Sequence, residues 1–600
     1  MKAKYIVLKI AAIIIAVGIN SCSDFLETTP KTEFSETSVF GDPVLVETFI
    51  NQIYFRLDEP LTDGRNTSNL VDEAHYRGNA GSLDFNRCLS TQDYLAGVGV
   101  RRYRSWADLY KTIRFCNIFF EKVDEVPFND NITDGKTLKD RMTGEVHFLR
   151  AYLYFSLINT YGGVPLIEEV YALDSEFEKA RNTWQQSVDF VVSECDKAAA
   201  LLPIENSGVN FGRATKGAAL ALKSRVLLYA ASDLYNTVVF SDYANQDLIR
   251  YTSISDNDRR TRWEAARQAA KAVIDMSKYS LHKAVPAASD SVAVNITEIF
   301  LSKNTGEDIF FKFFTPAMAQ NWTLYTSPNG YFGWGTNAPL GNMVDAFEMR
   351  DGTKFDWNNP KHAAKPYSYR EPRFYANILY NEASWRERPE GSKPYDPVNK
   401  MQTGTWEEWS ASENKMVERF GVDTRKGAIE DWNGSYTGYY CRKNLDPTVL
   451  PAVTKGTTTW RWFRYAEILL NYAEACMELG DDAEARTYIN MVRKRAGLPD
   501  LTESGSALRQ RYRNERRIEL CFEDHRFYDV RRWVIGQEAY CPVTQAIIVY
   551  KLQLDHTTAA IPEVKHVVWE TRSWNNKGYF LPLLRDEVNK NPLLINNPGY

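Results

Sequence analysis

The sequence predicts a mainly α-helical chain of paired antiparallel helices with a large irregular, loop-rich region packed against them. Long stretches with apolar residues three and four positions apart alternate with short breaks along much of the chain. Residues 289–460 interrupt this pattern and are rich in Gly, Pro and aromatic residues. The helical pairs repeat in pattern without repeating in residue identity. We therefore expect a tetratricopeptide-like superhelix of about four pairs, with a plain helical bundle as the alternative.

Residues 464–499 give the clearest helical pair. The first helix has one apolar face, formed by Ala466, Leu469, Leu470, Ala473, Cys476 and Met477. Gly480 is expected to end this helix in the left-handed conformation, and Asp481 or Asp482 to cap the next. The second apolar stripe comprises Ala485, Tyr488 or Ile489, Val492 and Ala496, and Gly497 and Pro499 end it. Such a hairpin cannot bury its own apolar faces, so it needs similar neighbours.

Similar helical stretches precede it. A short helix is expected within residues 34–56, and longer ones at 106–123, 143–160, 184–202, 215–235 and 263–277. Thr215 is a plausible N-cap for the helix it opens. Short strands are expected near residues 308–314. Cys116, Cys195 and Cys476 lie on apolar stripes and read as small buried hydrophobic residues.

Composition excludes several classes of function. The chain has 600 residues, 44% hydrophobic content and a net charge of −5, with acids and bases mixed throughout. A nucleic-acid binder would show a basic patch, which is absent here. Its eight cysteines have no CxxC spacing, so neither a disulfide framework nor a zinc site is expected. Asp256-Asn257-Asp258 is a weak metal motif and reads better as a solvated turn. No cofactor is expected.

The first 22 residues read as a targeting segment. Lys2, Lys4 and Lys9 supply positive charge before the apolar run Ile10–Ile19, which is too short for a comfortable membrane span. The run ends at Cys22 and resembles a bacterial lipoprotein signal, so we expect lipidation of Cys22. An ordinary secretory signal with an incidental Cys is the alternative. The acidic residues in Ser23–Glu27 resemble a surface-export signal.

A dense pattern of acids and bases covers residues 515–533. Arg526, Asp529 and Arg532 are expected to form buried ion pairs with Glu515, Glu519 and Glu523. Paired carboxylates can also do acid–base catalysis. An Arg beside each Glu favours the ionised form, however, which suits a structural network better than a proton donor.

This segment, ERRIELCFEDHRFYDVRRW, resembles the hallmark of the SusD/RagB family of nutrient-binding outer-membrane lipoproteins. Four further segments resemble family segments in the same order: residues 145–167, 213–230, 344–352 and 580–600. The resemblance implies a signal peptide at 1–21, an N-terminal SusD-like helical region at 22–288 and a RagB/SusD C-terminal region at 289–600. The last region holds the irregular aromatic insert 289–460, the final helical pair and the signature.

The resemblance also implies a non-enzymatic protein that acts as a lid on a SusC-like TonB-dependent transporter. It would be anchored in the outer membrane by lipid on Cys22, would face the cell exterior and would capture glycans. A RagB-like peptide-binding lid is the alternative. A surface glycosidase is a third possibility, but it needs two carboxylates roughly 5–9.5 Å apart, which a sequence does not reveal.

Two stretches offer the mixture of aromatic platforms and polar groups that sugars require, residues 72–94 and 322–334. The expected platforms are Trp322, Tyr325, Tyr331 and Trp334. The expected polar partners are Asp72, Arg77 and Asp84, with Tyr76 between them. Packing of the irregular half onto the helices, or contact with the transporter, is the alternative role for these residues.

Overall fold

The computed structural model describes residues 39–62, 64, 66–76, 80–96, 105–172, 178–540, 544–549, 551 and 565–600. The described chain is mainly helical, with short strands, as the sequence predicts. The predicted leader 1–21, Cys22 and Arg77 lie outside these residues. Within the described part of the chain, none of the helices is long and apolar enough to cross a membrane.

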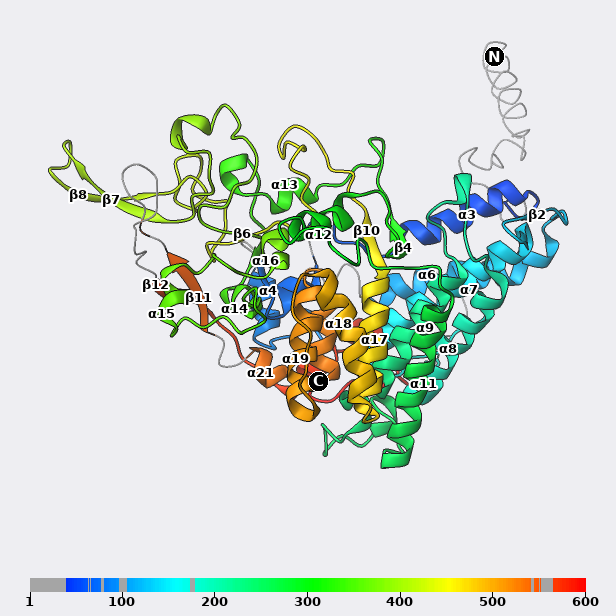
Figure 1. Cartoon of the computed structure of the whole chain (residues 1–600). Coiled ribbons are helices and arrows are strands. Elements are labelled where there is room, and N and C mark those ends of the chain that lie inside the picture. The colour runs from blue at the N-terminus through cyan, green and yellow to red at the C-terminus, as the bar shows by residue number, and fades with distance from the viewer. Residues whose placement is uncertain are drawn as a thin grey trace, which may run out of the picture.

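The long helices form one continuous array in which each packs on the next (Figure 1). They are α6 (Trp106–Lys122), α7 (Leu138–Tyr161), α8 (Trp184–Leu201), α9 (Lys216–Ala231), α11 (Asp256–Asp275), α17 (Tyr465–Glu478), α18 (Asp482–Arg495) and α19 (Gly505–Glu519). Helix α3 (Pro43–Phe55) packs on α6 and α7. Helix α11 contacts α17 although the whole loop-rich region separates them in sequence. The predicted tetratricopeptide-like helical pairing is confirmed.

Local signals end and begin the helices where the sequence predicts. Gly480 follows α17 with φ +88°, a left-handed conformation that glycine adopts without strain. The Asp481 side chain accepts a hydrogen bond from the Glu484 backbone N–H at 3.2 Å and so caps α18. The Thr215 hydroxyl accepts a hydrogen bond from the Ala218 backbone N–H and so caps α9. Asp256–Asp258, expected as a solvated turn, is instead the first turn of α11.

The strands pair in twos among the described residues. They are β1 (Ala74–Tyr76), β2 (Ile132–Thr133), β3 (Lys136–Thr137), β4 (Asp308–Lys312), β5 (Asn337–Pro339), β6 (Ile378–Leu379), β7 (Thr405–Ser410), β8 (Lys415–Phe420), β9 (Tyr440–Cys441), β10 (Trp460–Arg464), β11 (Thr544–Val549) and β12 (Lys565–Thr571). Because β4 pairs antiparallel with β10, the two ends of the loop-rich region lie side by side against the helical array.

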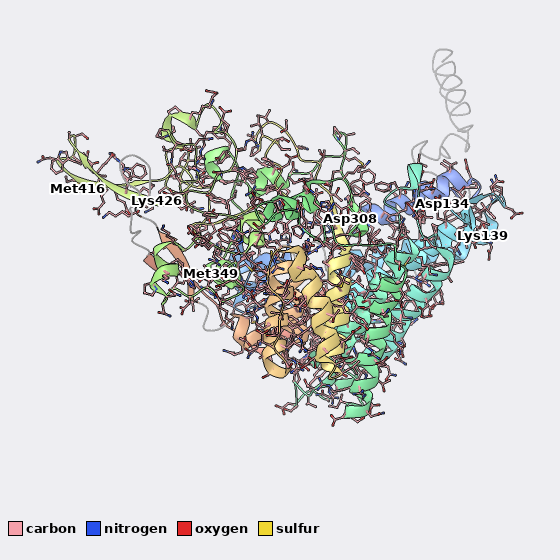
Figure 2. All side chains as sticks on the ribbon, in the orientation of Figure 1. Asp134, Lys139, Asp308, Met349, Met416 and Lys426 are labelled. Carbon is pink, nitrogen blue, oxygen red and sulfur yellow. The ribbon has the colours of Figure 1, made fainter. Side chains whose placement is uncertain are left out.

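Short helices occur among the strands and irregular segments. They are α4 (Ala80–Asn86), α10 (Asp233–Asn236), α12 (Val292–Leu301), α13 (Trp322–Thr326), α14 (Gly341–Ala346), α15 (Pro360–Ala364), α16 (Pro372–Asn377), α20 (Arg526–Arg532), α21 (Gly536–Tyr540) and α22 (Arg585–Lys590). The hairpin β7–β8 projects from the loop-rich half, with Met416 near its outer end and Lys426 nearer its base (Figures 1 and 2).

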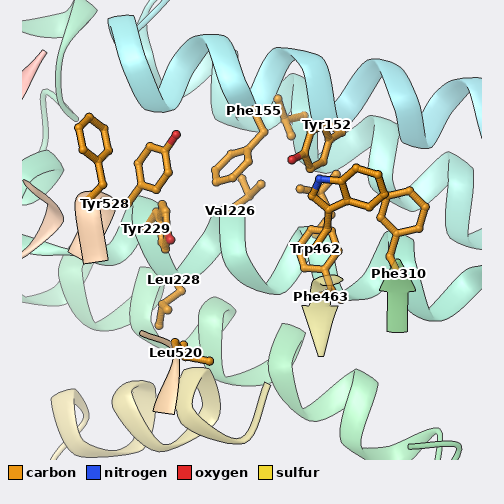
Figure 3. Packing of buried hydrophobic residues seen from close by; sticks show 14 of the residues in the cluster. Tyr152, Phe155, Val226, Leu228, Tyr229, Phe310, Trp462, Phe463, Leu520 and Tyr528 are labelled. Atoms are coloured by element: carbon orange, nitrogen blue, oxygen red, sulfur yellow. The ribbon is translucent and has the colours of Figure 1, made fainter. Parts of the chain in front are cut away.

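One hydrophobic core runs from the helices into the loop-rich half. The rings of Phe310 on β4 and Trp462 on β10 stack with centroids 4.7 Å apart, against Tyr152 on α7 (Figure 3). Cys116, Cys195 and Cys476 are buried as predicted. The paired strands β4 and β10 are therefore packed into the core of the helical array.

A buried ionic network lies beside this junction. The predicted network exists, but its partners differ from those expected. Glu515 pairs with Arg373 and Arg493, Glu519 with Arg373, Arg464 and Arg495, and Glu523 with Arg464 and Lys443. The basic partners of these three glutamates therefore come from outside the signature segment. Asp529, in contrast, pairs with Arg516 and Arg532 within it. The arginines hold the pKa values of Glu515 and Glu519 below their ordinary range although burial alone would raise them.

Candidate functional site

Strands β1 and β5 bring the two predicted stretches together. They pair antiparallel, with His75 opposite Ala338 and Tyr76 opposite Asn337. The Asn69 amide also donates to the Asn337 side-chain oxygen at 2.7 Å. Residues 72–94 and 322–339, far apart in sequence, therefore form one region of the loop-rich half, as a shared binding site requires.

Tyr325 and Trp334 form an aromatic pair within this region. Their ring centroids lie 4.9 Å apart at an interplanar angle of 77°, and both side chains are half-buried. Backbone hydrogen bonds from Trp334 to Leu324 and from Thr336 to Tyr325 fix the two segments against each other. The pair therefore presents partly exposed rings from a backbone that is held in place.

A second group of side chains adjoins this pair. His75 packs edge-on against Tyr436 at 5.3 Å, and the Arg425 guanidinium lies 4.0 Å from the Tyr436 ring centre. Gly434 in the same loop donates its N–H to the Trp334 carbonyl at 3.3 Å. His75 also contacts the Glu570 carboxylate through Nδ1 at 2.9 Å. We call His75, Tyr76, Tyr325, Trp334 and Tyr436, all half-buried, the central surface.

Sequence reasoning missed His75, Arg425 and Tyr436. Tyr436 follows an exposed Trp432 in a Gly- and Asn-containing loop, and that composition was the available signal. Nothing in the sequence indicated that this loop lies against β1, because a segment without apolar periodicity does not show which other segment it packs against.

Trp322 and Tyr331 are not exposed platforms, and that expectation is wrong. Trp322 is 1% exposed, and its Nε1 donates to the Lys443 carbonyl at 3.1 Å. Tyr331 is fully buried, donates to the Arg386 carbonyl and stacks under the Arg388 guanidinium. Both aromatics therefore pack the interior of the loop-rich half, Trp322 through a backbone carbonyl and Tyr331 through a backbone carbonyl and the buried Arg388.

Asp72 is also wrongly assigned as an open hydroxyl acceptor. Its two carboxylate oxygens each accept from Arg526 at 2.9 Å, and Arg517 lies 3.1 Å away. Burial alone would raise the pKa of Asp72, but the two guanidinium groups hold it well below its ordinary value. Asp72 therefore ties β1 to the signature segment and has little capacity left for a ligand.

Tyr76 and Asp84 remain candidates. Tyr76 is half-buried on β1, and the half-buried Asp84 on α4 accepts a hydrogen bond from the Tyr94 hydroxyl at 3.1 Å. No described cluster of three His, Cys, Asp or Glu side chains has a metal-binding arrangement.

A pocket of about 620 Å³ lies elsewhere, between α3, α6, α7 and β4. Two of its carboxylates are engaged internally, because Tyr152 donates to Asp58 at 2.9 Å and Lys312 pairs with Glu59 at 3.3 Å. We place the candidate site at the central surface instead, because strands β1 and β5 bring the two predicted stretches together there.

Comparisons with known proteins decide the family. A model of the SusD family matches residues 302–600, and a second model, described as starch-binding and associating with the outer membrane, matches residues 24–228. A solved SusD-like protein of Bacteroides fragilis is 30% identical, covers 94% of this chain and 99% of its own, and has a TM-score of 0.71. The chain belongs to the SusD/RagB family. The resemblance predicted from the signature is therefore confirmed.

Two more distant SusD-like proteins extend this result. A SusD-like carbohydrate-binding protein of Bacteroides fragilis is 22% identical, covers 93% of this chain and all of its own, and has a TM-score of 0.68. A SusD-like protein of Formosa agariphila is 23% identical over 566 residues, which is 91% of this chain and 95% of its own. The SusD/RagB fold thus accounts for nearly the whole chain, including the loop-rich half that carries the central surface.

Proposed function

We propose that this SusD/RagB family member captures oligosaccharides or polysaccharides at the cell surface and delivers them to a SusC-like TonB-dependent transporter. One observation carries the proposal: strands β1 and β5 assemble partly exposed aromatic rings and polar side chains into the central surface. Flat apolar rings contact the C–H faces of sugars, and adjacent polar groups bind their hydroxyls.

The electrostatics of the signature segment support binding rather than catalysis. Its carboxylates Glu515, Glu519, Glu523 and Asp529 are buried and paired with arginines, and the pKa values of Glu515 and Glu519 are lowered. A general acid needs a raised pKa, so these groups are unsuited to protonating a glycosidic oxygen. The chain is therefore proposed to have no hydrolytic activity of its own.

Anchoring is proposed to occur through lipid on Cys22. The basic, apolar leader that ends at this Cys supports the proposal. Each buried acyl methylene contributes about 0.8 kcal/mol, so several chains hold a protein stably. The description of the matching family model, which includes association with the outer membrane, supports that location. We propose that the anchored protein faces the cell exterior.

The test uses the mature chain without its leader and a panel of purified polysaccharides. Retarded migration in native gels containing one polysaccharide, followed by calorimetry with oligosaccharides prepared from it, would support glycan capture. Trp334→Ala should weaken binding, whereas Trp409→Ala on the projecting hairpin should not. Binding of a peptide mixture with no glycan binding would favour the peptide-importing alternative, and release of sugars from the polysaccharide would identify an enzyme.

A further inference from the structure

Phe332 holds a backbone conformation that its side chain disfavours. Its φ of +62° and ψ of +25° lie in the left-handed region, directly after the 3₁₀ turn Asn329–Tyr331. Its N–H donates to the Asn329 carbonyl at 2.8 Å. Glycine usually occupies such a position, because a Cβ crowds the backbone there.

The next residue is Gly333, and phenylalanine and glycine cannot be swapped between these two positions. A Cβ on Gly333 would lie 2.3 Å from the Ser327 carbonyl oxygen, so residue 333 must be glycine for packing. The turn at 332 is left-handed in the structure. The chain therefore keeps a phenylalanine at the one position in this turn where glycine would relieve strain.

Core packing does not explain this choice. The Phe332 side chain is 37% exposed, and its ring rests on Gly391, where a Cβ would lie 3.0 Å from the ring Cζ. Strained residues persist where the surrounding structure imposes them, and they concentrate at functional sites. The left-handed turn therefore carries a ring that is partly exposed to solvent.

The loop that Phe332 contacts carries polar side chains. Lys393 pairs with Glu387 at 2.9 Å and with Glu390, and these side chains are exposed on the loop that holds Gly391. Tyr395 on the same loop is 46% exposed. Trp334 of the central surface is two residues further along the chain. An aromatic ring beside exposed charged groups has the composition of a sugar contact.

We propose that Phe332 is a glycan-contacting platform that extends the binding site from the central surface toward the loop of Gly391 and Tyr395. This inference rests on the proposed glycan capture. It implies that the ligand covers more than the Tyr325–Trp334 pair and is an oligosaccharide of several units or a polysaccharide.

The test compares Phe332→Gly, Phe332→Tyr and Tyr369→Gly with the wild-type chain. Affinity for the glycan selected by the panel is measured by calorimetry, and the melting temperature by scanning fluorimetry. Phe332→Gly should lower affinity about 3- to 10-fold, the range for loss of one aromatic contact, and leave the melting temperature unchanged or higher. Phe332→Tyr keeps the ring and should keep the affinity.

Tyr369 is the matched control. It is also an aromatic residue with a left-handed backbone, at φ +56°, and its side chain is 76% exposed. It lies in a different turn, where its carbonyl accepts a hydrogen bond from the Arg350 backbone N–H. Tyr369→Gly should leave affinity unchanged. Wild-type affinity of the Phe332→Gly variant would overturn this inference but not the proposed function. A large loss of melting temperature, or failure of this variant to fold, would also overturn the inference. Absence of glycan binding by the wild type would overturn the proposed function and this inference together.

Discussion

The Arg464 guanidinium donates from Nη1 to the Glu519 carboxylate at 2.7 Å, and both side chains are almost completely buried. Arg464 ends β10 and precedes α17, whereas Glu519 ends α19. Glu519 also pairs with Arg373 of α16, which belongs to the loop-rich half. One carboxylate therefore links three segments and fixes the loop-rich half on the helical array.

Replacing Arg464 with alanine should destabilise the protein strongly. The change leaves Glu519 and Glu523 with fewer counter-charges in a buried site, so the free energy of unfolding should fall by about 3–5 kcal/mol. Urea unfolding followed by tryptophan fluorescence measures this. Arg585→Ala is the control, since Arg585 forms an exposed ion pair with Asp93 and its loss should change stability little. Equal effects of the two substitutions would contradict the structural role of the network.

Glu73→Gln should stabilise the protein at neutral and mildly alkaline pH. Burial, reinforced by the neighbouring Asp72 charge, raises the pKa of Glu73 to about 8 from an ordinary 4.5, and its Oε2 is buried without a hydrogen-bond partner. The folded chain therefore keeps a proton that the unfolded chain releases, and stability is lost as pH rises from 4.5 to about 8. A glutamine at position 73 does not ionise, so the variant avoids this loss, which is roughly 1–3 kcal/mol of the free energy of unfolding at pH 8.

Glu474 is the control for Glu73, because its pKa is shifted in the opposite direction. Arg532 and Arg516 lower the pKa of Glu474 to about 2 although burial alone would raise it. Its contribution is therefore present above pH 4.5 and is lost as pH falls toward 2, so Glu474→Gln should destabilise the protein at neutral pH. Unfolding curves between pH 4.5 and 8 test both variants. A Glu73→Gln protein no more stable than the wild type at pH 8 would refute the assignment.

Trp322→Ala and Trp334→Ala should separate stability from binding. Trp322 is buried and hydrogen-bonded, so truncating it should cost about 3–5 kcal/mol of stability. Trp334 is half-buried, so its truncation should chiefly reduce glycan affinity. Thermal melts and calorimetry on both variants check this. A Trp334→Ala protein with wild-type affinity would remove this residue from the site.

The sequence predicted the helical half well because its signals are local. The three- and four-residue spacing in 464–499, the glycine at 480 and the cap at Asp481 each act within one or two turns, and each is found in the structure. The loop-rich half has no such periodicity. Its order depends on long-range pairs such as β4 with β10 and β1 with β5, which local residue patterns do not encode.

The candidate site was predictable only in part, for the same reason. Composition drew attention to the 322–334 stretch, but it did not indicate which of its rings turn inward: Trp322 and Tyr331 pack the core, while Tyr325 and Trp334 are partly exposed. Likewise, the acid–base pattern of the signature predicted a network, but Arg464, Arg373 and Lys443 reach it from segments outside the signature.

Gly64→Ala should disturb the central surface without touching a ligand. Gly64 has φ +71°, and a Cβ there would lie 2.6 Å from the Tyr325 Cβ, so alanine must displace Tyr325 from its packing on Trp334. Glycan affinity should fall about 3-fold or more, on the scale of one aromatic contact. Gly135→Ala is the matched control, because Gly135 has φ +78° and open space around it. It should lose a similar backbone free energy, about 1 kcal/mol, and keep full affinity by calorimetry. Equal affinities of the two variants would show that the position of Tyr325 does not govern binding.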